Sequence, residues 1–138
     1  MQSKNIHTIS GSKTVWEAAR MMAELNIGAL VVGTPQKIAG LFTERDILNK
    51  VVGNNLSLES TKIKDVKSTN IMFVEDNEMV YVALKIMQEK KFRHLPVVNE
   101  KGLCVGMVSI RDLMKAISEI FEKENNGLVS YIAGLSLS

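Results

Sequence analysis

Apolar residues in the first part of the chain form two kinds of pattern, a helical spacing and short continuous runs. From Val15 to Leu25 they are spaced three and four residues apart, which predicts a helix with one buried face. Thr43 begins a second helical stretch that is expected to reach about Val52. The strands predicted around the first helix are short apolar runs, at residues 6–9, 29–32 and 38–42. The predicted order is therefore strand, helix, strand, strand, helix.

The second part of the chain predicts the same order of elements. A polar stretch at residues 53–62 is expected to link the two parts. A helix is expected over residues 78–90, with Asp76 or Asn77 as its cap. A longer helix is expected over residues 109–123. The three predicted strands are again short apolar runs, at residues 71–74, 96–98 and 103–108.

A seven-residue motif occurs twice. The sequence GLFTERD at residues 40–46 returns as GMVSIRD at residues 106–112, a shift of 66 residues. The same shift aligns further apolar residues without a gap, namely Val31-Val32 with Val97-Val98 and Met21 with Met87. An internal repeat of this kind indicates duplicated units. We therefore predict a mixed α/β (α+β) fold of two βαββα repeats that pack with pseudo-two-fold symmetry.

Composition and charge argue against several classes of protein. The 138 residues are 46% hydrophobic and 23% charged, as in soluble globular proteins. Each half is so small that we expect the halves to share one core. Lys and Arg number 17 against 15 Asp and Glu, a balance that argues against nucleic-acid binding. No apolar run would span a membrane and no signal pattern begins the chain, so we expect a cytoplasmic protein, or one of an organelle matrix if a targeting segment was removed.

Residues that could carry chemistry are few. The single cysteine, Cys104, lies in an apolar run and is expected to be a buried strand residue. The sequence has no Cys-x-x-Cys or His-x-x-x-His spacing, no phosphate-loop lysine motif and no nucleophile–base pair. We therefore expect neither a metal nor catalytic activity.

The repeated motif has two interpretations. Thr43 with Asp46, and Ser109 with Asp112, have the spacing of a capping box, in which a hydroxyl and an acid close the start of a helix. Alternatively, the hydroxyl and the helix start hold a phosphate, because the first N–H groups of a helix are unpaired. The carboxylate could then accept from both hydroxyls of a ribose, since it has two oxygens.

Cations near the motif favour an anionic ligand. Arg45 and Arg111 fall in the first turn of their helices, where the helix dipole disfavours a positive charge unless an anion binds there. Arg93 and His94 precede the strand that leads to the second motif, and Arg suits a bidentate contact with phosphate. Otherwise these two are solvated residues at a strand start. By the 66-residue shift the first copy has Ile27-Gly28 in their place, so its pocket lacks both cations.

The strands NIGALVV and RHLPVV, with the endings GLFTERD and GMVSIRD, resemble a tandem pair of CBS domains, a Bateman module. The resemblance covers about residues 6–118. It implies a non-catalytic regulatory module that binds adenosine-containing nucleotides in two clefts between the repeats and senses the energy or redox state. Because the two repeats fill nearly the whole chain, we expect a stand-alone protein. AMP, ADP, ATP and NAD are the candidate ligands, with S-adenosylmethionine behind them. The alternative is a ligand-free dimerisation or scaffold module whose motifs serve only as helix caps.

The resemblance also assigns residues to two nucleotide sites, with ribose on the motif Asp and phosphate on the Thr or Ser. The residues of one site are Ser109, Asp112, Arg93 and His94, with Ile27 and Gly28 on the adenine side. Those of the other are Thr43 and Asp46. Leu30 stands where the family often has a proline, a departure that concerns the site at Asp46.

The predicted organisation has three parts. The first repeat with its linker spans residues 1–57, the second repeat residues 58–124, and a C-terminal tail residues 125–138. We expect a homodimer formed through the helices that follow the motifs, acting on an unidentified partner protein. The apolar tail is expected to fold back or to lie across the partner subunit, because an exposed apolar cluster is unfavourable.

Overall fold

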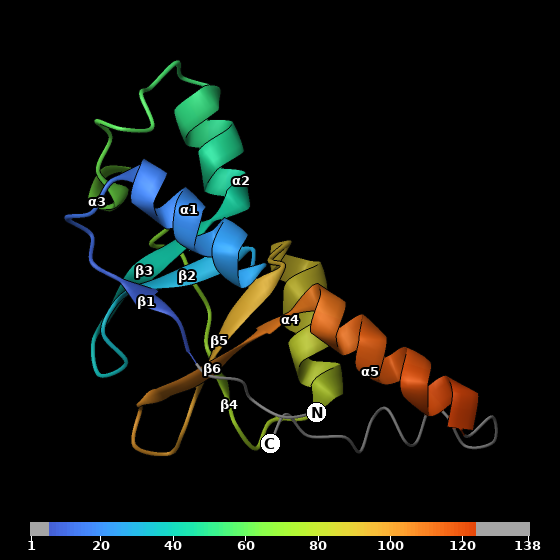
Figure 1. Cartoon of the computed structure of the whole chain (residues 1–138). Helices are drawn as coiled ribbons and strands as arrows, with labels where there is room; N and C mark the ends of the chain where they lie inside the picture. Colours follow the sequence, from blue (N-terminus) through green and yellow to red (C-terminus); the bar gives the residue numbers. More distant parts are fainter. Residues whose placement is uncertain (1–5, 124–138) are drawn as a thin grey trace. The chain divides into compact units, whose positions relative to one another are not determined.

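The structure, a computed structural model, describes residues 6–123 and places them in two compact units (Figure 1). The first unit is Ile6–Ile71, and the second unit begins at Met72. The predicted apolar tail, with its expected contact to a partner subunit, lies outside the described residues.

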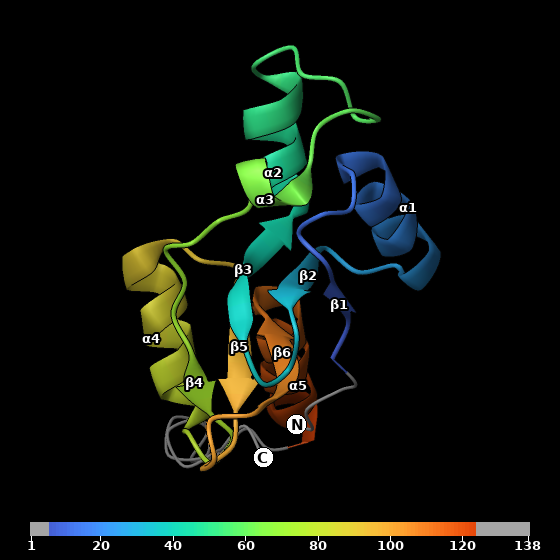
Figure 2. The ribbon, with the colours of Figure 1, turned by 90° about the vertical axis from the view of Figure 1, so that its left-hand side faces the viewer.

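The first unit contains a three-stranded sheet with helices packed on it (Figure 2). Its elements in order are β1 (Thr8–Ile9), α1 (Val15–Leu25), β2 (Ala29–Gly33), β3 (Ile38–Thr43), α2 (Glu44–Asp46), η1 (Ile47–Val52) and α3 (Ile63–Val66). Strand β2 is central, parallel to β1 and antiparallel to β3. The predicted strand–helix–strand–strand–helix order is confirmed.

Helix α1 has the predicted limits because both of its ends are capped. Thr14 Oγ1 accepts from Glu17 N at 3.2 Å, and Glu17 Oε2 accepts from Thr14 N at 3.0 Å, which is a capping box. Asn26 ends the helix in the left-handed conformation, with φ 54°. The core that the helix forms with the sheet includes Val15, Ala18, Met22, Leu30, Val32 and Phe42.

Two features of the first unit differ from the prediction. The helix after the motif has the expected limits, but η1 winds as a π-helix, and Gly53 N donates to Leu48 O, five residues back, at 2.9 Å. The polar stretch after it leads into the short helix α3, which the sequence did not predict because four residues show no periodicity. Ile63 and Val66 of α3 are buried in the core of the first unit.

The second unit repeats this plan with a regular final helix. Its elements are β4 (Val74–Glu75), α4 (Val80–Lys90), β5 (His94–Val98), β6 (Cys104–Ser109) and α5 (Ile110–Lys123). Strand β5 is central, parallel to β4 and antiparallel to β6. Helices α4 and α5 lie side by side (Figure 1). The core includes Val74, Val80, Ala83, Met87, Leu95, Val97, Val108 and Leu113.

The cap predicted for α4 is wrong. The N-cap residue is Met79, and its side chain makes no capping hydrogen bond. Asp76 N instead donates to Val98 O at 2.9 Å, and Glu78 N donates to Glu75 O at 3.0 Å. The polar residues before the helix are therefore used to leave the sheet and to turn the chain.

The two sheets pair their strands in the same way, but equivalent residues of the two repeats are not always the same number of positions apart in the sequence. Val32 pairs with Gly40 in the first, and Val97 pairs with Gly106 in the second. The glycines are 66 residues apart and the valines 65. The buried helix residues also follow the shift of 65, namely Val15, Ala18 and Met22 with Val80, Ala83 and Met87. The gapless alignment is therefore wrong by one residue, which lies in the longer turn between β5 and β6.

The buried side chains form two clusters, one in each unit, and the sharing of one core by the two halves stays a prediction. Each small sheet is covered by helices of its own unit, and this gives each repeat an apolar interior. The methionines Met22 and Met87 are core residues, as their helical spacing predicted. Cys104 is 2% exposed in β6, which confirms it as a buried strand residue.

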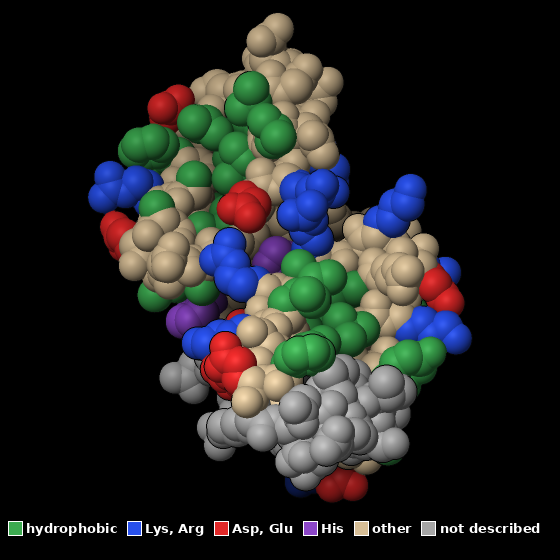
Figure 3. All heavy atoms as spheres, turned by 90° about the vertical axis from the view of Figure 1, so that its right-hand side faces the viewer, with side chains coloured by type: hydrophobic (Ala, Val, Ile, Leu, Met, Phe, Trp, Pro, Cys, Tyr) green, Lys and Arg blue, Asp and Glu red, His purple; other side chains and the backbone are tan. Residues whose placement is uncertain are grey.

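The described residues include no helix with the length and apolar character needed to cross a bilayer. On the face drawn in Figure 3, Lys and Arg side chains are interspersed with Asp and Glu side chains. That face therefore presents both signs of charge, in keeping with the small net charge of +2.

Candidate functional site

Both copies of the motif close a helix start with the same pair of hydrogen bonds. In the first, Asp46 Oδ2 accepts from Thr43 N at 3.0 Å, and Thr43 Oγ1 accepts from Asp46 N at 3.2 Å. In the second, Asp112 Oδ2 accepts from Ser109 N at 3.1 Å, and Ser109 Oγ accepts from Asp112 N at 3.1 Å. The capping boxes predicted from the spacing are therefore present, and each uses one carboxylate oxygen.

The other carboxylate oxygen of Asp46 is occupied. Asp46 Oδ1 accepts from Ser68 Oγ at 2.9 Å and forms an ion pair with Lys50 Nζ at 3.0 Å. Lys50 Nζ also donates to Val66 O at 3.1 Å and lies 3.4 Å from Ser68 Oγ. Asp46 is 5% exposed, so a buried carboxylate is satisfied entirely by its own chain.

The other carboxylate oxygen of Asp112 has no hydrogen-bond partner among residues 6–123. One cause lies in the sequence, because the residue four positions after Asp112 is Ala116, whereas Lys50 follows Asp46 at that spacing. Asp112 is also only partly buried. This oxygen is therefore available to a donor from outside the described chain.

Arg93 and His94 lie beside the second motif, as their sequence positions predicted. His94 begins β5 and pairs with Ser109 across the hairpin. Arg93 is exposed just before this strand, and its carbonyl accepts from Ile110 N at 2.9 Å. A hydroxyl, a guanidinium, an imidazole and a carboxylate are thus gathered at one end of the sheet.

The first unit has a different pair of residues at these positions. Ala29 pairs with Thr43, and Glu44 N donates to Gly28 O at 3.0 Å. The counterparts of Arg93 and His94 are therefore Gly28 and Ala29, and the prediction of Ile27-Gly28 is wrong by one residue. The first motif still lacks both cations. Ile27 packs against the core of the first unit, so its contact with an adenine stays a prediction.

Arg45 and Arg111 follow their motif hydroxyls and are exposed in the first turn of their helices. Neither guanidinium forms an ion pair within residues 6–123. Both arginines are accessible to an anion, and their contact with a phosphate stays a prediction.

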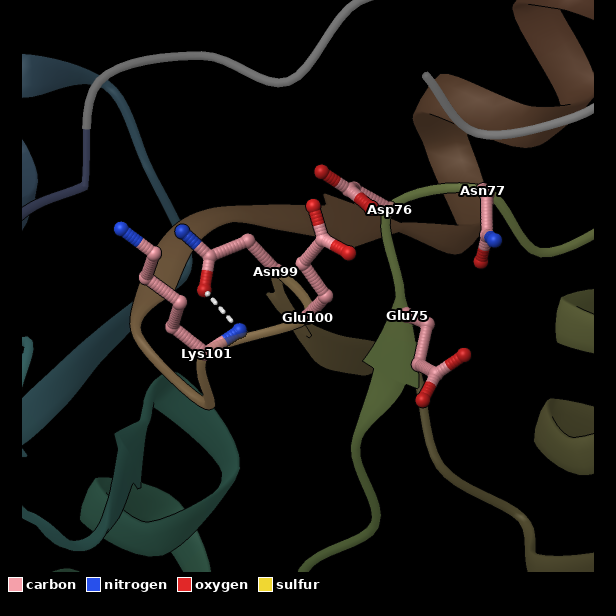
Figure 4. A pocket seen from close by; sticks show the side chains of 6 residues that line it. All are labelled: Glu75, Asp76, Asn77, Asn99, Glu100 and Lys101. Carbon is pink, nitrogen blue, oxygen red and sulfur yellow. Dashed lines mark hydrogen bonds between the residues drawn. The ribbon is translucent and has the colours of Figure 1, made fainter.

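A depression of about 350 Å³ lies at the end of the second sheet that is opposite to the second motif (Figure 4). Its lining side chains are Glu75, Asp76, Asn77, Asn99, Glu100 and Lys101. Asn99 Oδ1 accepts from Lys101 N at 3.0 Å and from Leu103 N at 3.0 Å, which stabilises the turn between β5 and β6. Three carboxylates against one lysine make this depression unfavourable for a phosphate. No group of three metal-ligating side chains occurs in the described part of the chain.

The sequence interpretation missed the partners of Asp46. A lysine four residues after a helical aspartate is a familiar signal for an ion pair, and Lys50 could have been found that way. Ser68 lies 22 residues beyond Asp46, and no local pattern indicates their contact. It follows from the return of the chain to β3, where Leu41 N donates to Ser68 O at 2.9 Å and Ser68 N donates to Leu41 O at 2.8 Å.

Comparison with known proteins identifies the repeat. The family model of the CBS domain matches residues 1–53 and 63–119. The chain is 37% identical over 126 residues to the mitochondrial CBS domain-containing protein CBSX3 of Arabidopsis thaliana, which covers 88% of this chain and 61% of that protein. The chain thus spans about three fifths of the length of this relative.

Solved structures agree with the assignment. A signal-transduction protein with CBS domains from Burkholderia ambifaria has a TM-score of 0.78 and 35% identity, with 83% of this chain and 84% of that chain covered. The CBS domain protein PAE2072 from Pyrobaculum aerophilum, solved in complex with AMP, has a TM-score of 0.75 and 29% identity, with 88% and 94% covered. With two matched repeats over most of its length, the chain belongs to the CBS domain family.

Proposed function

We propose that this protein is a regulatory module that binds an adenosine-containing nucleotide at its second motif and acts on a partner protein. AMP, ADP, ATP and NAD are the candidate ligands, and we assign the module no catalytic role of its own. The AMP complex of the Pyrobaculum relative supports the ligand class. We also propose that it works in the cytoplasm.

One observation carries the proposal. Asp112 holds its helix start with one oxygen, while the other has no partner among the described residues. The two hydroxyls of a ribose are donors that suit such an oxygen. Ser109, Arg93 and Arg111 lie on the neighbouring strand ends and first helical turn, where they would contact a phosphate.

The alternative is that both motifs are only helix caps, and substitutions at Asp112 separate the two functions. Asp112→Ala removes the cap and the free oxygen together, and we expect it to weaken AMP binding by about 1–3 kcal/mol. Asp112→Asn keeps an oxygen that can cap the helix but removes the charge and one acceptor. We expect Asp112→Asn to lose nucleotide affinity while it keeps most of the thermal stability.

Calorimetry with AMP, ADP, ATP, NAD and S-adenosylmethionine is the measurement. The matched control is Glu17→Ala, which removes the capping box of α1 with similar bond lengths and should leave the nucleotide affinity unchanged. If Asp112→Ala binds every nucleotide as the parent does and loses only stability, the motif is a cap alone.

We further propose a homodimer formed through the helices that follow the motifs. Met114 and Phe121 of α5 are 56% and 59% exposed, and Ile110 and Ile117 lie on the same helical stripe. In the first repeat the counterpart of Met114 is Leu48 of η1, which is also exposed. Apolar residues in a stripe of this kind are favourably covered by a second copy of the chain.

Sedimentation of charged variants tests the dimer. Met114→Glu should convert the dimer to a monomer at micromolar concentration, because it places a charge in the apolar contact. Tyr81→Glu is the control, since Tyr81 is 53% exposed on α4 and outside the stripe. A parent protein that sediments as a monomer with and without AMP would contradict the proposal.

A further inference from the structure

The first motif differs from the second in what its carboxylate already binds. Both oxygens of Asp46 are engaged by the chain itself, through Thr43, Lys50 and Ser68. Ser68 belongs to residues 67–71, here called the connecting segment, which joins α3 to the second unit. The contact with Asp46 therefore ties the connecting segment to the motif.

The backbone reinforces this tie. Leu41 of β3 and Ser68 exchange two hydrogen bonds of 2.9 and 2.8 Å, so the connecting segment adds one bridge to the outer edge of the sheet. A Cβ atom at Gly40 would lie 2.6 Å from Ser68 O. The glycine of the first motif is thus the residue that allows the connecting segment to come this close.

Lys50 also connects the first motif to the connecting segment. Its ammonium group lies within 3.4 Å of three oxygens, Asp46 Oδ1, Ser68 Oγ and Val66 O, and so bridges the motif, the connecting segment and the end of α3. The counterpart of Lys50 in the second motif is Ala116, which cannot make such a bridge.

We propose that Asp46, Lys50 and Ser68 form a latch that fastens the connecting segment to β3. A ligand hydroxyl that replaces Ser68 on Asp46 Oδ1 removes this side-chain hydrogen bond, so occupation of the first motif loosens the connecting segment, which the backbone bonds to Leu41 then hold alone. The second half of this inference rests on the proposed nucleotide binding, whereas the latch itself does not.

Amide hydrogen exchange tests the latch without a ligand. In Ser68→Ala, the amide of Leu41 should exchange at least about threefold faster than in the parent, because the side-chain tie that holds its acceptor in place is lost. Thr69→Ala is the control, since the neighbouring Thr69 is exposed and its side chain forms no hydrogen bond with the described residues. Equal exchange in the parent and both variants would overturn the latch.

Calorimetry tests the competition with a ligand. In an Asp112→Ala background, which leaves the first motif intact, Ser68→Ala should raise the affinity for AMP about fivefold, because one competing hydrogen bond is removed. An unchanged or lower affinity would overturn the competition, and a lower one would make Ser68 a ligand contact. If neither variant binds AMP while the parent does, the competition fails and the proposed function stands. If the parent does not bind AMP either, the proposed function fails as well, and in both cases the exchange of Leu41 still decides the latch.

Discussion

Asp46 and Asp112 make the same capping hydrogen bonds at the start of their helices, but the rest of their surroundings differ. Asp46 is buried and both of its oxygens have partners, whereas Asp112 is partly exposed and one of its oxygens has none among the described residues. The helix after Asp46 winds as a π-helix, and the helix after Asp112 is a regular α-helix. A shared motif therefore specifies a helix start, and the residues around it decide whether the carboxylate remains available.

The largest expected effect is on stability, and it separates the two aspartates. Asp46→Ala should destabilise the protein by about 2–4 kcal/mol, because it removes a cap and a buried network that also involves Ser68. Asp112→Ala should cost about 1 kcal/mol, the usual value for a cap alone. Urea unfolding of both variants gives the comparison. Equal losses would mean that Asp46 gains nothing from its extra partners.

A substitution at Gly40 tests the close approach of the connecting segment. Gly40→Ala should cost about 1–3 kcal/mol, because the new Cβ atom meets the carbonyl of Ser68 at 2.6 Å and the backbone must move. Gly11→Ala should cost less, since its nearest neighbour is a side-chain atom of Lys64 at 3.2 Å. Thermal unfolding measures both changes. A tolerated alanine at position 40 would show that the connecting segment shifts easily.

An exchange of the residues four positions after the aspartates sharpens the comparison further. Lys50→Ala should lower the stability by about 1 kcal/mol at most, because Lys50 is 42% exposed and its ion pair is screened by water. Ala116→Lys should weaken AMP binding at Asp112 by offering the free oxygen an internal partner. Lys85→Ala, at an exposed lysine of α4, is the control for removing a charge. An unchanged AMP affinity in Ala116→Lys would show that the lysine alone does not close the site.

The smallest expected effect is on the pH dependence of stability, and it comes from Cys104, whose counterpart in the first repeat cannot ionise. Burial raises the pKa of the Cys104 thiol above its ordinary value of 9.0, and the repeat has Ile38 in its place. The native thiol keeps its proton where the unfolded thiol already ionises, so stability is lost as the pH rises above that ordinary value. The melting temperature of the parent should therefore fall more between pH 8 and 10 than that of Cys104→Ala. Parallel curves would contradict this.

The order of elements, the limits of α1 and α5 and both capping boxes could be predicted from the sequence, because they depend on local spacing. The alignment of the two repeats, however, was wrong by one residue for the central strands β2 and β5. The doublets Val31-Val32 and Val97-Val98 match at a shift of 66, whereas the strand pairing aligns Val32 with Val97. A shift of one residue reverses the face of every strand side chain, so its consequences reach the site.

That error explains the misplaced counterparts of Arg93 and His94. It also moves the departure from Leu30 to Val31, since Pro96 corresponds to Val31 and Leu95 to Leu30. The helix α3 and the contact of Ser68 with Asp46 could not be predicted, because both depend on how the chain returns to β3 after a long polar stretch. Tertiary contacts of this kind leave no periodic trace in the sequence.

The difference between the two carboxylates has a consequence for the timing of a response. At Asp112 the acceptor is already oriented by its cap, so association there should follow the ligand concentration without an intervening step. At Asp46 the fraction of molecules with Ser68 displaced would limit the apparent affinity and the observed rate of the proposed binding. One chain would then report a rise in nucleotide twice, promptly through its second repeat and after a delay through its first.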